Sequence, residues 1–191
     1  YMTREPNERA ILMRIISGKY KAKKLHTLKS NDTRPTSDKV RESVFSMLGD
    51  VEGGVLDLFG GTGGLAIEAL SRGADRAMII DGAGDAIKII KENTKDLDEP
   101  VEIFRNDYRR ALKAMGKREK SFDLIFLDPP YNKKLIDKSL ELISEYSILN
   151  DGGRIVAEAG KNETFAHPGF EIVKENDYGS IKVWMLIKEG K

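Results

Sequence analysis

The chain has 191 residues, of which 40% are hydrophobic and 18 are glycine, with a formal net charge of +1 and no cysteine. This size and composition suit one soluble domain with its own core. Without cysteine and with only two histidines, a disulfide framework, a metal site and a cysteine or serine–histidine hydrolase are all disfavoured. No apolar run is long enough to span a bilayer, so we expect a cytoplasmic protein that binds neither membrane nor metal.

Charge is distributed unevenly along the chain. Residues 1–12 are neutral and lack periodicity, and we interpret them as an extension before the fold. Residues 13–41 hold nine basic and two acidic residues, whereas residues 42–191 hold 21 basic and 27 acidic residues. Such a basic segment predicts contact with a polyanion, although a solubilising extension would have the same composition. The candidate cations are Arg14, Lys19, Lys21, Lys23 and Lys24.

The first predicted elements lie in this basic segment. Short apolar stretches alternate with lysines around Gly18-Lys19, and this pattern predicts a hairpin arm over residues 13–36, with Ile15–Ile16 paired to residues 25–28. Thr36 or Ser37 then begins a helix, whose apolar face ends at Gly49. We take residues 37–191 as the main domain.

From residue 55, strand patterns alternate with helix patterns. The strands are predicted at 55–59, 76–81, 101–105 and 122–127, and the helices at 64–72, 85–97, 108–115 and 135–146. This alternation is typical of a parallel sheet with helical crossovers. Three more strands are predicted at 153–158, 170–176 and 181–187. The short turn at 177–180 requires the last two to be antiparallel.

A glycine-rich loop at residues 60–64 joins the first of these strands to its helix. Glycine allows positive φ and a close approach of backbone to ligand, and the helix N-terminus offers free N–H groups. A nucleotide-like ligand is therefore expected. The spacing Gly61-x-Gly63-x-x-Ala66, with Asp81 further on, also fits a dinucleotide fingerprint, so an NAD-dependent dehydrogenase stays open.

An acidic residue inside the strand before this loop favours a different cofactor. Asp57 is unusual for an NAD site and suits S-adenosylmethionine, whose α-amino group it can attract. Asp81 and Asp107 follow the next two strands. Because the carboxyl ends of parallel strands meet at one edge, we expect all three to face one crevice, although Asp107 could equally be a helix N-cap.

The segment Asp128-Pro129-Pro130-Tyr131 ends the strand 122–127 at the same edge. Exocyclic amines of bases are poor nucleophiles because the lone pair is delocalised into the ring. The Asp128 carboxylate and the Pro129 carbonyl can accept hydrogen bonds from such an amine and draw its lone pair out of conjugation. Pro129 and Pro130 fix the backbone, and Tyr131 can stack on a flipped-out base. The motif predicts methylation of an amino group.

Four segments together resemble the bacterial 16S ribosomal RNA guanine-N2 methyltransferases of the RsmD type, over residues 13–187. They are Thr33-Arg34-Pro35-Thr36-Ser37-Asp38-Lys39-Val40-Arg41-Glu42, Asp57-Leu58-Phe59-x-Gly61-x-Gly63, Glu68-Ala69-Leu70-Ser71-Arg72-Gly73-Ala74 and Asp128-Pro129-Pro130-Tyr131. The resemblance implies an α/β fold of class I, Rossmann-like, S-adenosylmethionine-dependent methyltransferases. Its sheet would have seven mostly parallel strands, an antiparallel C-terminal strand and a small N-terminal β-hairpin.

The resemblance also implies a reaction and roles for residues. A monomer would transfer a methyl group from S-adenosylmethionine to N2 of one guanine in 16S rRNA, within the small ribosomal subunit or its assembly intermediate. Asp57 and the loop from Gly61 to Gly63 would hold the methionine part, Asp81 the ribose and Asp107 the adenine amine. Asp128 and Tyr131 would orient guanine, and the basic arm would bind RNA. The further cofactor candidates are Phe59, Thr62, Arg34 and Thr36.

Other interpretations stay open. A DNA adenine-N6 or protein-glutamine methyltransferase shares the chemistry of the Asp128 motif, although the chain lacks a DNA target-recognition insert. A dehydrogenase would leave that motif and the basic arm unexplained. A non-catalytic RNA-binding assembly factor could keep the fold and bind the cofactor without turnover.

Overall fold

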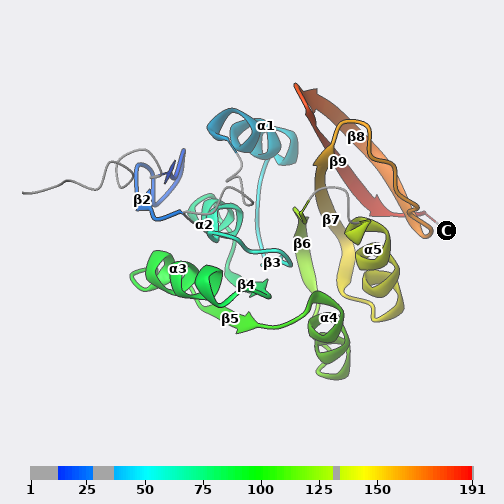
Figure 1. The fold of residues 1–191 in the computed structure, drawn as a ribbon, viewed down its shortest axis with the longest axis horizontal. Helices are drawn as coiled ribbons and strands as arrows, with labels where there is room; N and C mark the ends of the chain where they lie inside the picture. The colour runs from blue at the N-terminus through cyan, green and yellow to red at the C-terminus, as the bar shows by residue number, and fades with distance from the viewer. Residues whose placement is uncertain (1–12, 28–36, 131–133, 191) are drawn as a thin grey trace, which may run out of the picture.

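The computed structural model describes residues 13–27, 37–130 and 134–190. The described strands of the main sheet are β3 (Gly54–Asp57), β4 (Arg76–Asp81), β5 (Val101–Arg105), β6 (Phe122–Leu127), β7 (Leu149–Gly160), β8 (Phe170–Tyr178) and β9 (Ile181–Lys188). The described helices are α1 (Asp38–Leu48), α2 (Gly64–Ser71), α3 (Gly84–Thr94), α4 (Tyr108–Lys117) and α5 (Leu135–Glu145). The strand order is β5-β4-β3-β6-β7-β9-β8 (Figure 1).

The direction of the strands confirms the predicted fold class. Strands β3 to β7 pair in parallel, and within the described sheet β9 alone runs antiparallel to its neighbours β7 and β8. The two-residue turn at Gly179–Ser180, with φ 65° at Gly179, forces this reversal. A small antiparallel hairpin precedes the sheet.

Helices cover both faces of the sheet. Side chains from α1, α2 and α3 form one buried cluster with Val55, Leu124 and Phe126 of the central strands. Side chains from α4 and α5 form the other, with Leu56 and Ile125. Neighbouring residues of one strand therefore point into opposite layers, which is why these strands are almost wholly apolar. Figure 1 shows the two groups of helices on opposite sides of the sheet.

The boundaries of several elements differ from the predictions. Strand β7 begins at Leu149, four residues before the predicted start, because a register shift against β6 between Phe122 and Leu124 accommodates the turn-like segment 150–153. Helix α1 is as predicted: the Ser37 hydroxyl accepts a hydrogen bond from the Val40 N–H at 3.2 Å, and Gly49 follows its last turn with φ 65°.

The predicted pairing of the N-terminal hairpin is wrong. Strand β1 (Met13–Arg14) pairs with β2 (Lys24–Leu25), and the Ile15 N–H donates to the Lys23 carbonyl at 3.0 Å, so Ile15 does not reach residues 25–28. This register puts Met13, Ile15 and Leu25 together on Ile67 of α2 in a separate buried cluster. Burial of one face decided the register, which the spacing of apolar residues left ambiguous.

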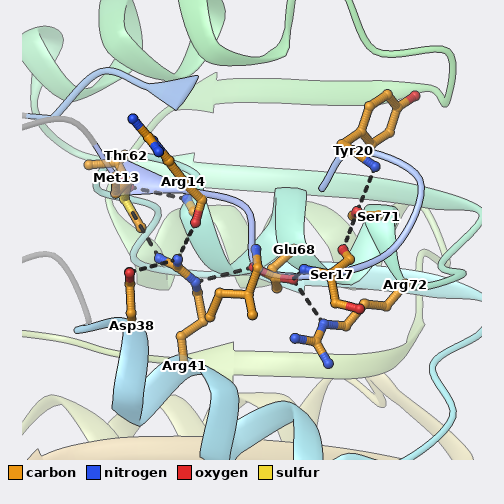
Figure 2. A network of polar contacts seen from close by, with 12 residues as sticks. Met13, Arg14, Ser17, Tyr20, Asp38, Arg41, Thr62, Glu68, Ser71 and Arg72 are labelled. Carbon is orange, nitrogen blue, oxygen red and sulfur yellow. Dashed lines mark hydrogen bonds and ion pairs between the residues drawn. The ribbon is translucent and has the colours of Figure 1, made fainter. Parts of the chain in front are cut away.

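A buried polar network fastens this hairpin to the main domain (Figure 2). Arg41 of α1 and Glu68 of α2 are both 0% exposed, and Arg41 Nε lies 3.2 Å from Glu68 Oε1 without hydrogen-bond alignment. The Glu68 carboxylate also accepts the N–H groups of Ile16 (2.9 Å) and Ser17 (3.2 Å). Arg72 Nε donates a hydrogen bond to Glu68 Oε2 at 2.9 Å. One buried carboxylate thus joins two helices to the hairpin.

We predict that Glu68→Gln lowers the free energy of unfolding by about 3–5 kcal/mol, because it removes the buried counter-charge of the Arg41 guanidinium and leaves only the exposed carboxylate of Asp38. Urea unfolding would measure the loss. Glu92→Gln is the control, since Glu92 forms an exposed i,i+3 pair with Lys95 and its loss should change stability little. Equal stability of the two variants would show that the buried pair does not hold the hairpin.

The described residues contain neither a membrane-spanning helix nor a cluster of metal-binding side chains. None of their helices has the length and apolar character needed to cross a membrane. No cluster of three or more His, Asp or Glu side chains with metal-binding geometry occurs in the same part of the chain.

Candidate active site

Three carboxylates meet at the carboxyl ends of neighbouring strands. Asp57, the last residue of β3, is paired with Ile79 of β4 on one side and with Phe126 of β6 on the other. Asp81 and Asp128 each lie two residues beyond those partners, so they flank Asp57 at the same edge. The chain runs outwards from β3 to β4 and β5, and then crosses back to β6 on the other side of β3. Open α/β sheets bind their ligands at such a switch point.

Asp57 is the most buried of the three carboxylates. Its side chain is 1% exposed, and its Oδ1 has no hydrogen-bond partner. Burial, followed by the negative charges of Asp128 and Asp81, raises the pKa of Asp57 to about 8, against the opposing effect of a hydrogen bond from the Phe59 backbone. A buried acceptor without a donor costs free energy. This position therefore suits a cationic or N–H group of a ligand.

The glycine loop beside Asp57 combines two different uses of glycine. Gly61 has φ 59°, and a Cβ built there would meet nothing within 4 Å, so the backbone is open to a ligand. At Gly60 a Cβ would lie 2.4 Å from Ile79 Cγ2, so this glycine serves close packing on β4. Gly63, with φ 81°, is the N-cap residue from which α2 begins.

Asp81 ties the glycine loop to the next helix. Its Oδ2 accepts the Gly61 N–H at 2.9 Å and its Oδ1 accepts the Ala83 N–H at 2.8 Å. Each oxygen keeps a second lone pair, so contact with ribose hydroxyls stays a prediction. A shallow hollow next to this carboxylate is lined by Ala83, Gly84, Asp85, Ile87, Lys88 and Arg105.

Asp107 is the N-cap of α4, the alternative that the sequence left open. Its Oδ1 accepts the backbone N–H groups of Arg109 (2.9 Å) and Arg110 (3.4 Å). A hydrogen bond from the Arg109 side chain lowers the pKa of Asp107. The predicted contact with an adenine amine is not tested by these bonds. The next residue, Tyr108, packs on Phe59 with ring centroids 5.3 Å apart, which places the start of α4 against the loop that follows Asp57.

A cavity of about 220 Å³ adjoins the Asp128-Pro129-Pro130 segment. Pro129 and Pro130 form part of its wall, and the rest includes Asp137 from the first turn of α5 and Phe165 from the loop after β7. Asp137 Oδ1 is buried without a hydrogen-bond partner, while its Oδ2 accepts the Ala166 N–H at 3.1 Å. Sequence reasoning missed Asp137 because an aspartate in a first helical turn is ordinary and carries no signal.

The arm is linked to the glycine loop through Met13 and Asn93, which sequence reasoning also missed. The Thr62 hydroxyl donates to Met13 Sδ at 3.5 Å. The Asn93 side chain accepts the His26 N–H at 2.8 Å and donates to the His26 carbonyl and the Thr62 carbonyl, both at 2.9 Å. Thr62, a predicted cofactor residue, is therefore held directly by Met13 of the arm and by Asn93 of α3, which also holds His26.

The predicted RNA-binding cations fall into two groups. Lys19 Nζ lies 2.8 Å from Asp98 and 3.3 Å from Glu99, and Lys23 Nζ lies 2.5 Å from Asp96. These two lysines fasten the arm to the acidic turn after α3. The others, Arg14, Lys21 and Lys24, are exposed, and no ion pair joins them to any residue that the structure describes.

Some predicted positions lie outside the described residues. These are Arg34 and Thr36, predicted to bind cofactor, Tyr131, predicted to stack on the base, and the segment 1–12.

The strand order, the single reversed strand and the acid-flanked glycine loop at the switch point define a class I methyltransferase fold. Within that class, the chain belongs to the family described as Conserved hypothetical protein 95, whose model matches residues 13–187. The sequence resemblance to the RsmD type is confirmed by relatives that are named ribosomal RNA small subunit methyltransferase D.

Two relatives and one solved structure illustrate the similarity. The chain is 42% identical over 184 residues to YlbH of Bacillus subtilis, provisionally named an rRNA methyltransferase, covering 93% of this chain and 100% of that protein. It is 30% identical over 175 residues to ribosomal RNA small subunit methyltransferase D of Haemophilus influenzae, covering 88% and 90%. A structure from Escherichia coli, provisionally named the methyltransferase yhhF, matches with TM-score 0.81 at 26% identity, covering 94% of this chain and 99% of that chain.

Proposed function

We propose that this protein is an S-adenosylmethionine-dependent methyltransferase that acts on the exocyclic N2 of a guanine in 16S rRNA, within the small ribosomal subunit or its assembly intermediate. The names of the relatives support rRNA of the small subunit as the substrate class. The observation that carries the proposal is the buried Asp57 carboxylate beside Asp128 at the central strand ends, whose Oδ1 has no hydrogen-bond partner. A ribosomal substrate also implies a cytoplasmic protein.

The residues present fit S-adenosylmethionine. Asp57 Oδ1 lacks a donor and can take a hydrogen bond from an α-amino group, and the open backbone at Gly61 admits a ligand close to the start of α2. Asp81 lies next to Gly61, on the side where the hollow of α3 can take a nucleoside. When bound, the cofactor supplies an electrophilic methyl group on a sulfonium.

The guanine end of the site is assigned to the Asp128-Pro129-Pro130 segment. Asp128 and the Pro129 carbonyl accept hydrogen bonds from the N2 amine, which draws its lone pair out of the ring and aims it across the site. Asp128 or solvent takes the proton that the amine loses. The prolines keep this short backbone stretch free of competing N–H donors.

Transfer of labelled methyl to three substrates tests the proposal: unmethylated small subunits, naked 16S rRNA and duplex DNA, with mass spectrometry of the digested nucleosides. N2-methylguanosine from the ribosomal samples is expected. The ratio of methylation in assembled subunits to methylation in naked 16S rRNA measures whether the particle or the enzyme supplies the specificity. Methyladenine in DNA would favour the DNA enzyme instead. Cofactor binding without transfer to any substrate would favour the non-catalytic assembly factor.

We predict that the two groups of arm lysines contribute unequally to RNA binding. Lys21→Gln with Lys24→Gln should flatten the plot of log affinity against log salt by about 1.4, since each lost phosphate contact contributes about 0.7 on single-stranded RNA. Lys19→Gln with Lys23→Gln makes the same change in net charge and should have less than half that effect, because those ammonium groups already face carboxylates. Equal effects of the two pairs would contradict the distinction.

A further inference from the structure

Helix α4 has an unusual charge for this domain. It carries Arg109, Arg110, Lys113 and Lys117 and no carboxylate. By sequence, α1 and α3 are each neutral, and α2 and α5 are each net negative. Residues 42–191 as a whole have more acidic than basic residues. The positive charge of α4 is therefore a local concentration on an acidic body.

The arrangement of most of these cations does not favour the isolated helix, and only Lys117, in the last turn, suits the negative end of the helix dipole. Arg109, Lys113 and Lys117 recur at i,i+4, where like charges repel each other. Arg109 and Arg110 also lie in the first turn, at the positive end of the helix dipole, where only the Asp107 cap offsets them. A sequence selected for stability alone would alternate these positions with glutamate. Binding of an anionic partner would explain why α4 carries cations that repel one another.

The cations face solvent with little internal compensation. Arg109 is paired with Asp107 at 3.2 Å. Arg110, Lys113 and Lys117 are exposed, and no carboxylate among the described residues lies within ion-pair distance of them. The apolar residues Ala111, Leu112 and Met115 bury the opposite face of the helix in the core. The basic face is thus presented outward by the packing of the helix.

The position of α4 connects this face to the candidate active site. Its first residue, Tyr108, packs on Phe59, which lies two residues after Asp57. From there the helix runs along the layer shared with α5, opposite the layer of α2 and α3 on which the arm docks (Figure 1). A nucleic acid whose base enters the site can therefore meet cations on both layers.

We propose that Arg110, Lys113 and Lys117 of α4 form a second RNA-binding surface, which contacts phosphates of the strand that carries the target base. The identity of the partner rests on the proposed function, and the charge of the surface fits it. The spacings of three and four residues between Arg110, Lys113 and Lys117 place one cation about every 4.5 to 6 Å along the helix axis. A backbone with one negative charge per nucleotide can follow such a repeat without any base-specific contact.

The test compares two double variants of equal net charge for binding to an unmodified 16S rRNA transcript. Lys113→Gln with Lys117→Gln should weaken binding about tenfold and flatten the salt dependence by about 1.4, about 0.7 per lost phosphate contact. The control is Lys174→Gln with Lys188→Gln, on β8 and β9 at the far edge of the sheet, and should leave both quantities near wild type. Lys113→Arg with Lys117→Arg should retain binding.

Four outcomes would overturn the proposal: unchanged affinity and salt slope in the α4 Gln variant, an equal loss in the control, a loss that Arg does not rescue, or a loss explained by a lower melting temperature. The α4 Gln variant should melt close to wild type, because relieved repulsion offsets the lost interaction of Lys117 with the negative end of the helix dipole. Methyl transfer by the wild type tests the proposed function separately. If the wild type methylates rRNA and the α4 variant binds RNA normally, the proposed RNA-binding surface is rejected and the proposed function stands.

Discussion

Asp128→Ala should reduce methyl transfer by a factor of about 100 to 1,000 while cofactor binding is retained. The loss follows from removing an acceptor that polarises the amine only as the methyl group is transferred, an electrostatic contribution of the size seen for single oxyanion-hole donors. Cofactor affinity should be equal or slightly tighter, because the charge of Asp128 contributes to the raised pKa of Asp57. Single-turnover rates and calorimetric titration measure the two quantities.

Glu141→Ala is the control for this variant, since Glu141 is an exposed carboxylate on α5 and should leave transfer unchanged. Asp128→Asn keeps one oxygen acceptor and should fall between wild type and Asp128→Ala. Full turnover in Asp128→Ala would remove Asp128 from the mechanism. A parallel loss of cofactor binding would instead place Asp128 in the cofactor site.

Asp57→Asn should weaken binding of S-adenosylmethionine about a hundredfold, because the α-amino group loses a buried charged partner. The pH dependence should be distinctive. With its pKa raised to about 8, the Asp57 carboxyl is mainly protonated at pH 7 when the site is empty. Pairing with a protonated α-amino group therefore releases a proton from Asp57. Affinity should therefore rise as the pH increases from 6 towards 8. Above pH 8 it should fall, because a free α-amino group loses its own proton near that pH.

Titration calorimetry in buffers of different ionisation enthalpy would count the proton released at pH 7. Unfolding of the empty protein provides an independent check. A carboxyl with a raised folded pKa stabilises the fold below its unfolded pKa, and this contribution is lost as the pH rises towards 8. Wild type should therefore lose stability relative to Asp57→Asn between pH 5 and pH 8. Constant relative stability and no proton release would contradict a buried, protonated Asp57.

The strands of the central sheet were predictable because each is an apolar run bounded by charged or turn residues. Strands β4, β5 and β6 begin and end as predicted. The carboxyl ends of parallel strands share one edge, so the grouping of Asp57, Asp81 and Asp128 followed from their positions after those runs. Long-range geometry was not needed for this step.

Other parts of the site depended on contacts between residues far apart in the sequence. Nothing in the spacing of Lys19 and Lys23 indicates that they face Asp96, Asp98 and Glu99, because complementary charges are found only when the arm docks. The hold of Asn93 on the glycine loop is of the same kind. Such contacts have no local periodicity from which they could be inferred.

By itself, the sequence determined the layered α/β fold, the glycine loop and the acids at the strand ends, since these follow from local patterns and a topological rule. The tertiary structure alone decided the hairpin register, the burial of Arg41 on Glu68 and the outward basic face of α4. The basic residues of α4 are visible in the sequence. Their significance required knowing which face packs into the core and that the helix starts beside Asp57, because burial and proximity are properties of the assembled layers.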